Sequence, residues 1–133
     1  MTQTAIGLSL RSCLLTRMGF QHLRVYQAAV RLRAETDCII TEIPARKRAA
    51  VTDLVKHLDE AINSIKNNIA EGNDSRYPAK RAFYFDVARG SGLEARSAFS
   101  SLVDRNVISA NRAFRAIGLT IVIDKMLRGM SPE

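Results

Sequence analysis

Apolar side chains recur every three or four positions along most of the chain after Gly19, and this spacing places them on one face of a helix. The clearest case runs from about residue 50 to residue 71, where charged and polar residues occupy the opposite positions. The apolar positions of this segment are Val51, Val55, Leu58, Ile62, Ile65 and Ile69. The pattern predicts an amphipathic helix that buries one face.

Three other segments show the same periodicity but carry apolar residues on more than one side. They run from about 20 to 41, from 78 to 104 and from 110 to 128. Within the last segment, the β-branched run at 119–123 is also compatible with a buried strand, but the helical pattern on both sides favours a helix. Because apolar surface on two sides needs two burial partners, we expect these helices to contact more than one neighbour.

The ends of the predicted helices coincide with residues that stop or start helices. Pro44 is expected to stop the first helix, and Gly72 to end the second by adopting the left-handed conformation found after many helices. Pro78 can begin the third helix, where its missing N–H is not needed, and Ser109 is a good N-cap for the fourth. Gly129 marks the end of the last helix.

Four helices of about twenty residues with short connections predict an all-α fold, an antiparallel up-down four-helix bundle over residues 20–130. We expect residues 1–19 to form a loosely ordered N-terminal extension and residues 131–133 to form a tail. Met18 stands immediately before the first periodic segment, so the native start is either Met1 or Met18. The spare apolar faces predict self-association, because large exposed apolar patches are uncommon on monomers.

The composition favours a single helical domain with a basic surface. With 133 residues, 47% of them hydrophobic and none of them Trp, the chain can form one core filled mainly by Leu, Ile, Val and Ala. A formal net charge of +7 favours an acidic partner, such as nucleic acid, an anionic membrane or an acidic protein. No segment approaches the roughly 18 uninterrupted apolar residues of a membrane span, so we expect no membrane insertion.

Residues that usually form metal or catalytic sites are sparse. Cys13, Cys38, His22 and His57 make no CxxC, Cys/His or HExxH arrangement, so we expect no metal, no cofactor and no disulfide framework. Reduced cysteines favour a cytoplasmic protein. No Ser-His-Asp or Cys-His constellation can be assembled, and RGSG at 89–92 lacks the spacing of a phosphate-binding loop. We therefore do not expect an enzyme.

Polar residues interrupt the apolar pattern near residue 68 and again near residue 91. Asn68 lies in the last turn of the second predicted helix and Ser91 in the middle of the third, which the intervening turn can bring close. We expect these two side chains to hydrogen-bond across the helix pair. Gly90 and Gly92 then serve to let two backbones approach, at a cost of about 1 kcal/mol each relative to Ala.

Two glutamates, Glu71 and Glu94, accompany these polar residues. The structural interpretation is that they accept hydrogen bonds from backbone N–H groups or from an arginine such as Arg89 or Arg96. A sharper alternative makes them an acid/base pair or two carboxylate ligands of a divalent ion, as in nucleases. Carboxylate metal sites in helical bundles usually need more carboxylates plus a Glu-x-x-His pair, which the chain lacks, so we favour the structural interpretation.

The segments NIAEG at 68–72 and ARGSGLE at 88–94 together resemble a motif pair of a bacterial four-helix-bundle family, first noted as open reading frames in intervening sequences of 23S rRNA genes. FQHLRVYQAAVRL at 20–32 and IDKMLRGM at 123–130 are similar to that family's first and last helices. The resemblance implies a ring-shaped homopentamer without established enzymatic activity. It also implies an RNA or DNA accessory role, since a related basic pentamer accompanies the reverse transcriptase of diversity-generating retroelements and is thought to bind nucleic acid.

Positive charge gathers at two connections between the predicted helices. The candidate nucleic-acid-binding residues are Arg46, Lys47 and Arg48 at the first connection and Arg76, Lys80 and Arg81 around the second. In an up-down bundle these connections fall at opposite ends, so we do not expect one patch in a single protomer. Asp59 and Glu60 stand where the family usually shows a basic pair, and they would repel phosphate on that face.

The tyrosines are the aromatic residues with a polar end that could also stack on bases. Tyr26 and Tyr84 fall in helical register, so we expect them to pack in the core or at an interface. Tyr77 lies in the turn beside Arg76, and we expect it to be exposed.

Two functions fit these features. The first is a homo-oligomeric nucleic-acid-binding accessory protein that contacts mainly phosphate. The alternative is a protein-interaction scaffold, a ring that docks an acidic partner or a polymerase and has no nucleic-acid affinity of its own. Asp59 and Glu60 favour the alternative.

Overall fold

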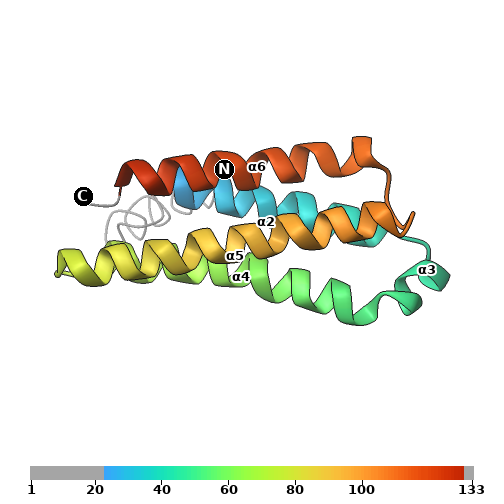
Figure 1. The fold of residues 1–133 in the computed structure, drawn as a ribbon, viewed down its shortest axis with the longest axis horizontal. Helices are drawn as coiled ribbons and strands as arrows, with labels where there is room; N and C mark the ends of the chain where they lie inside the picture. Colours follow the sequence, from blue (N-terminus) through green and yellow to red (C-terminus); the bar gives the residue numbers. More distant parts are fainter. Residues whose placement is uncertain (1–22, 131–133) are drawn as a thin grey trace, which may run out of the picture.

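The structure, a computed structural model, describes residues 23–130, and its regular elements in that range are all helices. The helices carry the labels of Figure 1: α2 (Arg24–Glu42), α3 (Ala45–Ala50), α4 (Thr52–Asp74), α5 (Pro78–Asp104) and α6 (Ala110–Met130). The predicted all-α fold class is confirmed. The run at 119–123, for which a strand was the alternative, lies inside α6.

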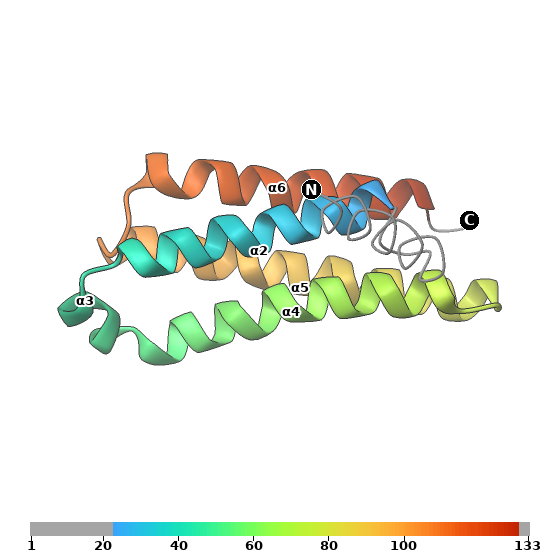
Figure 2. The same ribbon diagram turned by 180° about the vertical axis from the view of Figure 1, so that it is seen from behind.

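Four long helices lie side by side, and the short helix α3 lies at one end of them (Figures 1 and 2). α4 packs against α5 and α2, and α6 also packs against α5 and α2. Each long helix therefore has two neighbours, as expected for the three helices with apolar residues on more than one side, and α4 contacts two neighbours as well. Consecutive long helices run in opposite directions in both views.

α3 is a helix that the hydrophobic pattern did not predict. Its six residues, ARKRAA, include no large apolar side chain and none of them is buried, so no periodicity marks it. Pro44 precedes it with a backbone φ of −55°, close to the helical value. Val51, which is only 4% exposed, separates α3 from α4. The second predicted helix consequently begins at Thr52 rather than at about residue 50.

The first predicted helix ends where expected. α2 stops at Glu42, and Ile43 after it is extended, because a residue before proline avoids the helical conformation. The predicted role of Pro44 is confirmed. Within the described range α2 begins at Arg24, and residues 20–22, where the pattern placed the first turn, lie outside that range.

Two predicted helix starts are also confirmed. Pro78 occupies the beginning of α5, where a missing N–H costs nothing. Ser109 caps α6, since its Oγ accepts a hydrogen bond of 3.0 Å from the backbone N–H of Arg112. Between the two helices, Asn106 adopts a φ of 60°, a left-handed conformation that asparagine tolerates better than most residues.

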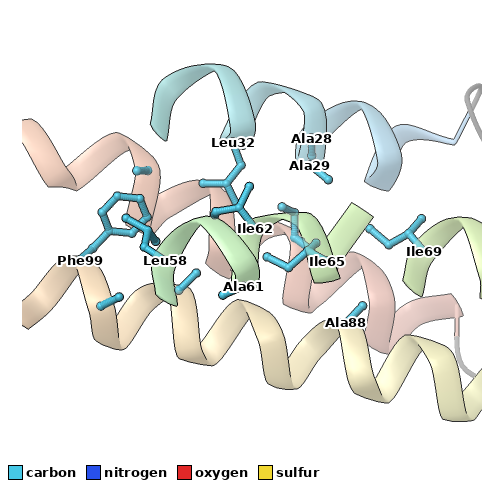
Figure 3. Close-up of a cluster of buried hydrophobic side chains, with 14 of the residues drawn as sticks. Ala28, Ala29, Leu32, Leu58, Ala61, Ile62, Ile65, Ile69, Ala88 and Phe99 are labelled. Carbon is cyan, nitrogen blue, oxygen red and sulfur yellow. The ribbon is translucent and has the colours of Figure 1, made fainter. Parts of the chain in front are cut away.

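The core lies among the long helices and is built from aliphatic residues and two phenylalanines. The predicted apolar stripe of α4 is confirmed, and its members from Leu58 onward are at most 1% exposed. Figure 3 shows Leu32 of α2 pointing toward Ile62 of α4. Phe85 and Phe99 of α5 are completely buried. Burial of each large apolar side chain contributes about 1.5–3 kcal/mol, so this shared core accounts for much of the fold's stability.

Gly72 does not end a helix, contrary to the sequence prediction. α4 continues through it to Asp74, and the extended residue that follows is Ser75. Gly72 is buried, and a Cβ atom placed on it would lie 2.5 Å from Cε1 of Phe85. The absence of a side chain therefore lets the Phe85 ring of α5 pack directly against the α4 backbone.

The role expected for Gly90 and Gly92, a close approach of two backbones, is wrong. A Cβ atom on Gly90 would meet nothing within 4 Å, and one on Gly92 would meet only the Cδ1 atom of Ile65, at 3.9 Å. The glycine required by a close approach is Gly72, two residues before the end of α4.

Several of the predictions concern residues before 23 or after 130, which the structure does not describe. The predicted extension at residues 1–19, the tail at 131–133, Cys13, His22 and the choice between Met1 and Met18 lie outside the described range. From residue 23 to residue 130, no helix combines the length and apolarity needed to cross a bilayer.

Candidate functional site

Asn68 of the NIAEG segment and Ser91 of the ARGSGLE segment lie between α4 and α5 and are joined through Ser64, not in the predicted pairing. The hydroxyls of Ser64 and Ser91 lie 2.7 Å apart and hydrogen-bond to each other. Asn68 donates to the carbonyl oxygen of Ser64 at 2.8 Å and to its Oγ at 3.1 Å. Asn68 therefore reaches Ser91 only through Ser64, because an asparagine side chain readily bonds the carbonyl one turn earlier.

The partners expected for Glu71 and Glu94 are wrong. Both glutamates are exposed, and neither side-chain carboxylate makes a hydrogen bond or ion pair with another described residue. Arg89 instead pairs with Asp124, and Arg96 donates to the hydroxyl of Thr120. From residue 23 to residue 130, no cluster of three or more His, Cys, Asp or Glu side chains is placed to hold a metal ion.

The other residues considered for chemistry lie mostly at the surface. His57 is exposed, and Cys38 is an exposed free thiol. Tyr77 is 66% exposed, as predicted. Tyr26 and Tyr84 are half-buried; Tyr26 packs against the core, and Tyr84 makes an edge-to-face contact with a neighbouring phenylalanine. The packing predicted for Tyr26 is confirmed, whereas packing of Tyr84 in the core or at an interface stays a prediction.

Arg46, Lys47 and Arg48 are all exposed on α3. Nζ of Lys47 donates to the backbone oxygen of Asn106 at 3.1 Å, which joins α3 to the connection between α5 and α6. Arg105, also exposed, precedes Asn106, so it belongs to the same end of the molecule. We call these four residues the α3-end basic surface. Arg105 was missed in the sequence because that connection carries no run of basic residues.

Negative charge near this surface is partly neutralised. Arg112 binds both carboxylate oxygens of Glu42, at 2.6 and 2.9 Å, and one oxygen of Glu35 at 2.5 Å. The hydrogen bond from Arg112 lowers the pKa of Glu42, and the same contact raises the pKa of Arg112. Asp53 and Asp104 are exposed at this end, but no carboxylate of the described chain pairs with the four basic side chains.

The second basic cluster lies at the other end of the molecule. Arg76 and Lys80 are exposed and Arg81 is half-buried, around the turn that joins α4 to α5. Figures 1 and 2 place this turn opposite α3. The prediction that the two clusters do not form one patch in a single protomer is therefore confirmed.

The two acidic residues expected to repel phosphate differ in their surroundings. Asp59 of α4 pairs with Arg33 of α2 at 2.7 Å, so part of its charge is neutralised. Glu60 is exposed and makes no ion pair with any residue in the described range. The acidic character of this face therefore rests mainly on Glu60.

Comparisons with known proteins give one match. A family model described as 23S rRNA-intervening sequence protein matches residues 21–129. No curated protein and no solved structure matches the chain. The matched range covers all five described helices except the last residue of α6.

Proposed function

The chain belongs to the 23S rRNA-intervening sequence protein family, and from this premise we propose that it is a non-enzymatic accessory protein that binds nucleic acid through phosphate contacts. The observation that carries the proposal is the α3-end basic surface, four exposed cations free of carboxylate partners in the described chain. The family name associates its members with ribosomal RNA genes, which makes RNA the first ligand class to test.

The charged side chains of this surface can bind nucleic acid without recognising its base sequence. Lysine and arginine side chains that neutralise phosphates release condensed counterions, and this term is independent of base sequence. None of the four residues of the α3-end basic surface is aromatic, whereas the exposed Tyr77 lies beside Arg76 at the opposite end. Phosphate contacts at the α3 end therefore dominate the proposed binding.

The proposal includes a four-helix-bundle protomer assembled into a homopentameric ring, as the family resemblance implies. Support comes from α6, where Phe114, Ile121 and Val122 are 79%, 38% and 43% exposed. Positions seven and eight residues apart lie on one side of a helix, so these side chains share the solvent-facing side of α6. A ring would repeat the α3-end basic surface five times and strengthen a weak contact by multivalency.

The test is the salt dependence of binding to single-stranded RNA and to single-stranded DNA. A variant in which Arg46, Lys47 and Arg48 are replaced by Ala should bind more weakly and show a flatter salt slope. Loss of three phosphate contacts lowers the slope of log K against log salt by about 2 for a single strand. The matched control replaces Arg76, Lys80 and Arg81 by Ala, which removes the same charge at the other end.

The two outcomes separate clearly. Retention of wild-type slope by the control, together with a flatter slope for the α3 variant, supports the proposal. Absence of RNA and DNA binding by the unmodified protein at low salt would overturn it.

The exposed carboxylate of Glu60 favours a second candidate, a scaffold that docks a protein partner such as a polymerase. A scaffold of this kind would retain a stoichiometric protein after nuclease treatment and would show no affinity for purified RNA. Replacing Glu60 by Gln should then release the partner, whereas the same change leaves phosphate binding unchanged or slightly stronger.

A further inference from the structure

A charged groove runs between α5 and α6, away from the α3-end basic surface. Its cavity volume is about 430 Å³, within the range of small-molecule sites. Its lining combines three arginines and two aspartates with Gly90 and Leu93. We call it the arginine groove. Neither the core nor the proposed phosphate contacts at the α3 end use these side chains.

One carboxylate in the groove holds two of the arginines. Asp124 of α6 accepts a hydrogen bond of 2.9 Å from Nε of Arg89 on its Oδ1 atom, and its Oδ2 atom lies 2.9 Å from Nε of Arg128. The bond to Arg89 lowers the pKa of Asp124 although burial raises it, and the charge of Arg128 lowers it further. Asp124 therefore stays ionised at neutral pH and fixes guanidinium groups from two helices.

The third arginine has no carboxylate partner. Nε of Arg96 donates to the Thr120 hydroxyl at 3.2 Å, and that hydroxyl donates to the backbone oxygen of Ile117 at 2.6 Å. Asp86 lies only at the margin of hydrogen-bond distance from Arg89, at 3.4 Å. Arg96 and Arg128 use Nε for these contacts, so their terminal NH₂ groups are oriented and available to donate hydrogen bonds to a ligand with several oxygens, whereas Arg89 also uses one terminal nitrogen for Asp86.

Gly90 keeps the groove open. A Cβ atom there would meet nothing within 4 Å, so packing inside the protomer does not require a glycine. A glycine in the middle of a helix costs about 1 kcal/mol relative to Ala, so its presence beside three arginines calls for another explanation. Leu93, which is 61% exposed, adds an apolar wall beside the same opening.

We propose that the arginine groove binds the phosphate group of a nucleotide or nucleic-acid strand. Arg96 and Arg128 contact the phosphate oxygens, Asp124 positions Arg89 and Arg128, and the gap above Gly90 admits the ester. This proposal rests on the proposed function only for the choice of a nucleotide or nucleic acid as the source of the phosphate. It adds a phosphate-binding site on the side of the molecule to the α3-end basic surface. The phosphate comes either from a strand end or mononucleotide, or from an internal phosphodiester.

The first measurement is a calorimetric or NMR titration with adenosine monophosphate at constant ionic strength, with adenosine and acetate as controls. We expect saturable binding of the monophosphate and none of adenosine. Arg96→Gln should weaken binding about tenfold. If acetate binds as well as the monophosphate, the groove recognises carboxylates, and the phosphate assignment is wrong.

A steric variant tests the site without removing charge. Gly90→Leu should fill the opening and weaken monophosphate binding about tenfold. Gly118→Leu is the matched control, because a Cβ atom on Gly118 also meets nothing within 4 Å and Gly118 does not line the groove. Both changes raise helix propensity, and thermal unfolding of each variant verifies that lost binding does not reflect lost folding.

Single strands with and without a 5′-phosphate identify the source. If Arg96→Gln weakens only the phosphorylated strand, the groove takes strand ends; if it weakens both, the groove takes internal phosphodiesters. Failure of the wild-type protein to bind the monophosphate, or equal binding by the wild type and both groove variants, would overturn the groove proposal. In that case, strand binding that still depends on Arg46, Lys47 and Arg48 leaves the proposed function intact.

Discussion

At the scale of single residues, the contact between Gly72 and Phe85 sets a strict limit on side-chain size. We expect Gly72→Ala to destabilise the protein, because the new methyl group would lie 2.5 Å from Cε1 of a ring that is completely buried. Overpacking costs about 1–3 kcal/mol, and because the ring must shift at such a short separation, we expect this cost to exceed the gain of about 1 kcal/mol from replacing glycine by alanine in a helix. Chemical denaturation monitored by circular dichroism measures the net change.

Gly90→Ala is the matched control for that substitution. Because a Cβ atom at Gly90 meets nothing, this variant should gain up to about 1 kcal/mol of stability. Equal effects of the two alanines would show that the Phe85 contact does not constrain α4.

Arg112 provides a prediction about pH. Since its hydrogen bond lowers the pKa of Glu42, the resulting stabilisation is present above the ordinary carboxyl pKa of about 4.3 and is lost as pH falls through the lowered value. Arg112→Gln should therefore unfold at a lower temperature than the wild type at pH 7. The difference should shrink as pH falls below about 4.

Arg115→Gln is the control for Arg112, because Arg115 is exposed and makes no ion pair within the described chain. It should shift the unfolding temperature little at any pH. A difference between Arg112→Gln and wild type that stays constant from pH 7 to pH 3 would contradict the assignment to Glu42.

Residue partners were harder to predict than residue positions. The sequence indicated that residues 68–72 and 88–94 meet, but it gave Asn68 rather than Ser64 as the partner of Ser91. Helical periodicity shows which residues share a face, whereas the choice among neighbouring hydroxyls and amides depends on ångström-scale offsets between two helices. The same limit explains why Gly90 was expected to do what Gly72 does.

At the scale of helices, α4 and α5 are joined by a polar contact inside an apolar interface. The Ser64–Ser91 hydrogen bond is partly buried, so removing one hydroxyl leaves the other without its partner. We expect a double-mutant cycle of Ser64→Ala and Ser91→Ala to give a coupling of about 0.5–1.5 kcal/mol in urea unfolding. Coupling near zero would indicate that water replaces the missing hydroxyl.

The helices themselves were predictable where their signals are local. Pro44, Pro78 and Ser109 mark the expected boundaries, since proline and capping residues act on the backbone next to them. α3 was not predictable from periodicity, because a helix with no buried residue leaves no apolar pattern. Its basic residues were nevertheless identified from charge alone.

At the scale of the whole molecule, substitutions on the exposed side of α6 can test whether the protein self-associates through this side. Phe114 is 79% exposed, so Phe114→Ser should lower the assembly state seen by analytical ultracentrifugation if this side forms the contact between copies. Phe83→Ser is the matched control, because Phe83 is 61% exposed but rests against Tyr84 on α5. A wild-type protein that sediments as a 14.8 kDa particle at micromolar concentration would refute the assembly.

Some features of the candidate site could be predicted from the order of the helices, whereas others depend on contacts between residues far apart in the chain. The opposite placement of the two basic clusters followed from helix direction, which the order of the helices determines. The inclusion of Arg105 did not follow, because it depends on the contact between Lys47 and the backbone of Asn106, residues far apart in the chain. The arginine groove likewise combines side chains of α5 with Asp124 and Arg128 of α6.

The first turn of α2 and the last turn of α6 lie toward one end of the molecule, and α3 lies at the other (Figures 1 and 2). A tether attached after Met130 would thus anchor the protein by the face remote from Arg46, Lys47 and Arg48. If the protein is immobilised in this orientation on a sensor chip, every copy exposes its α3-end basic surface to the flowing sample.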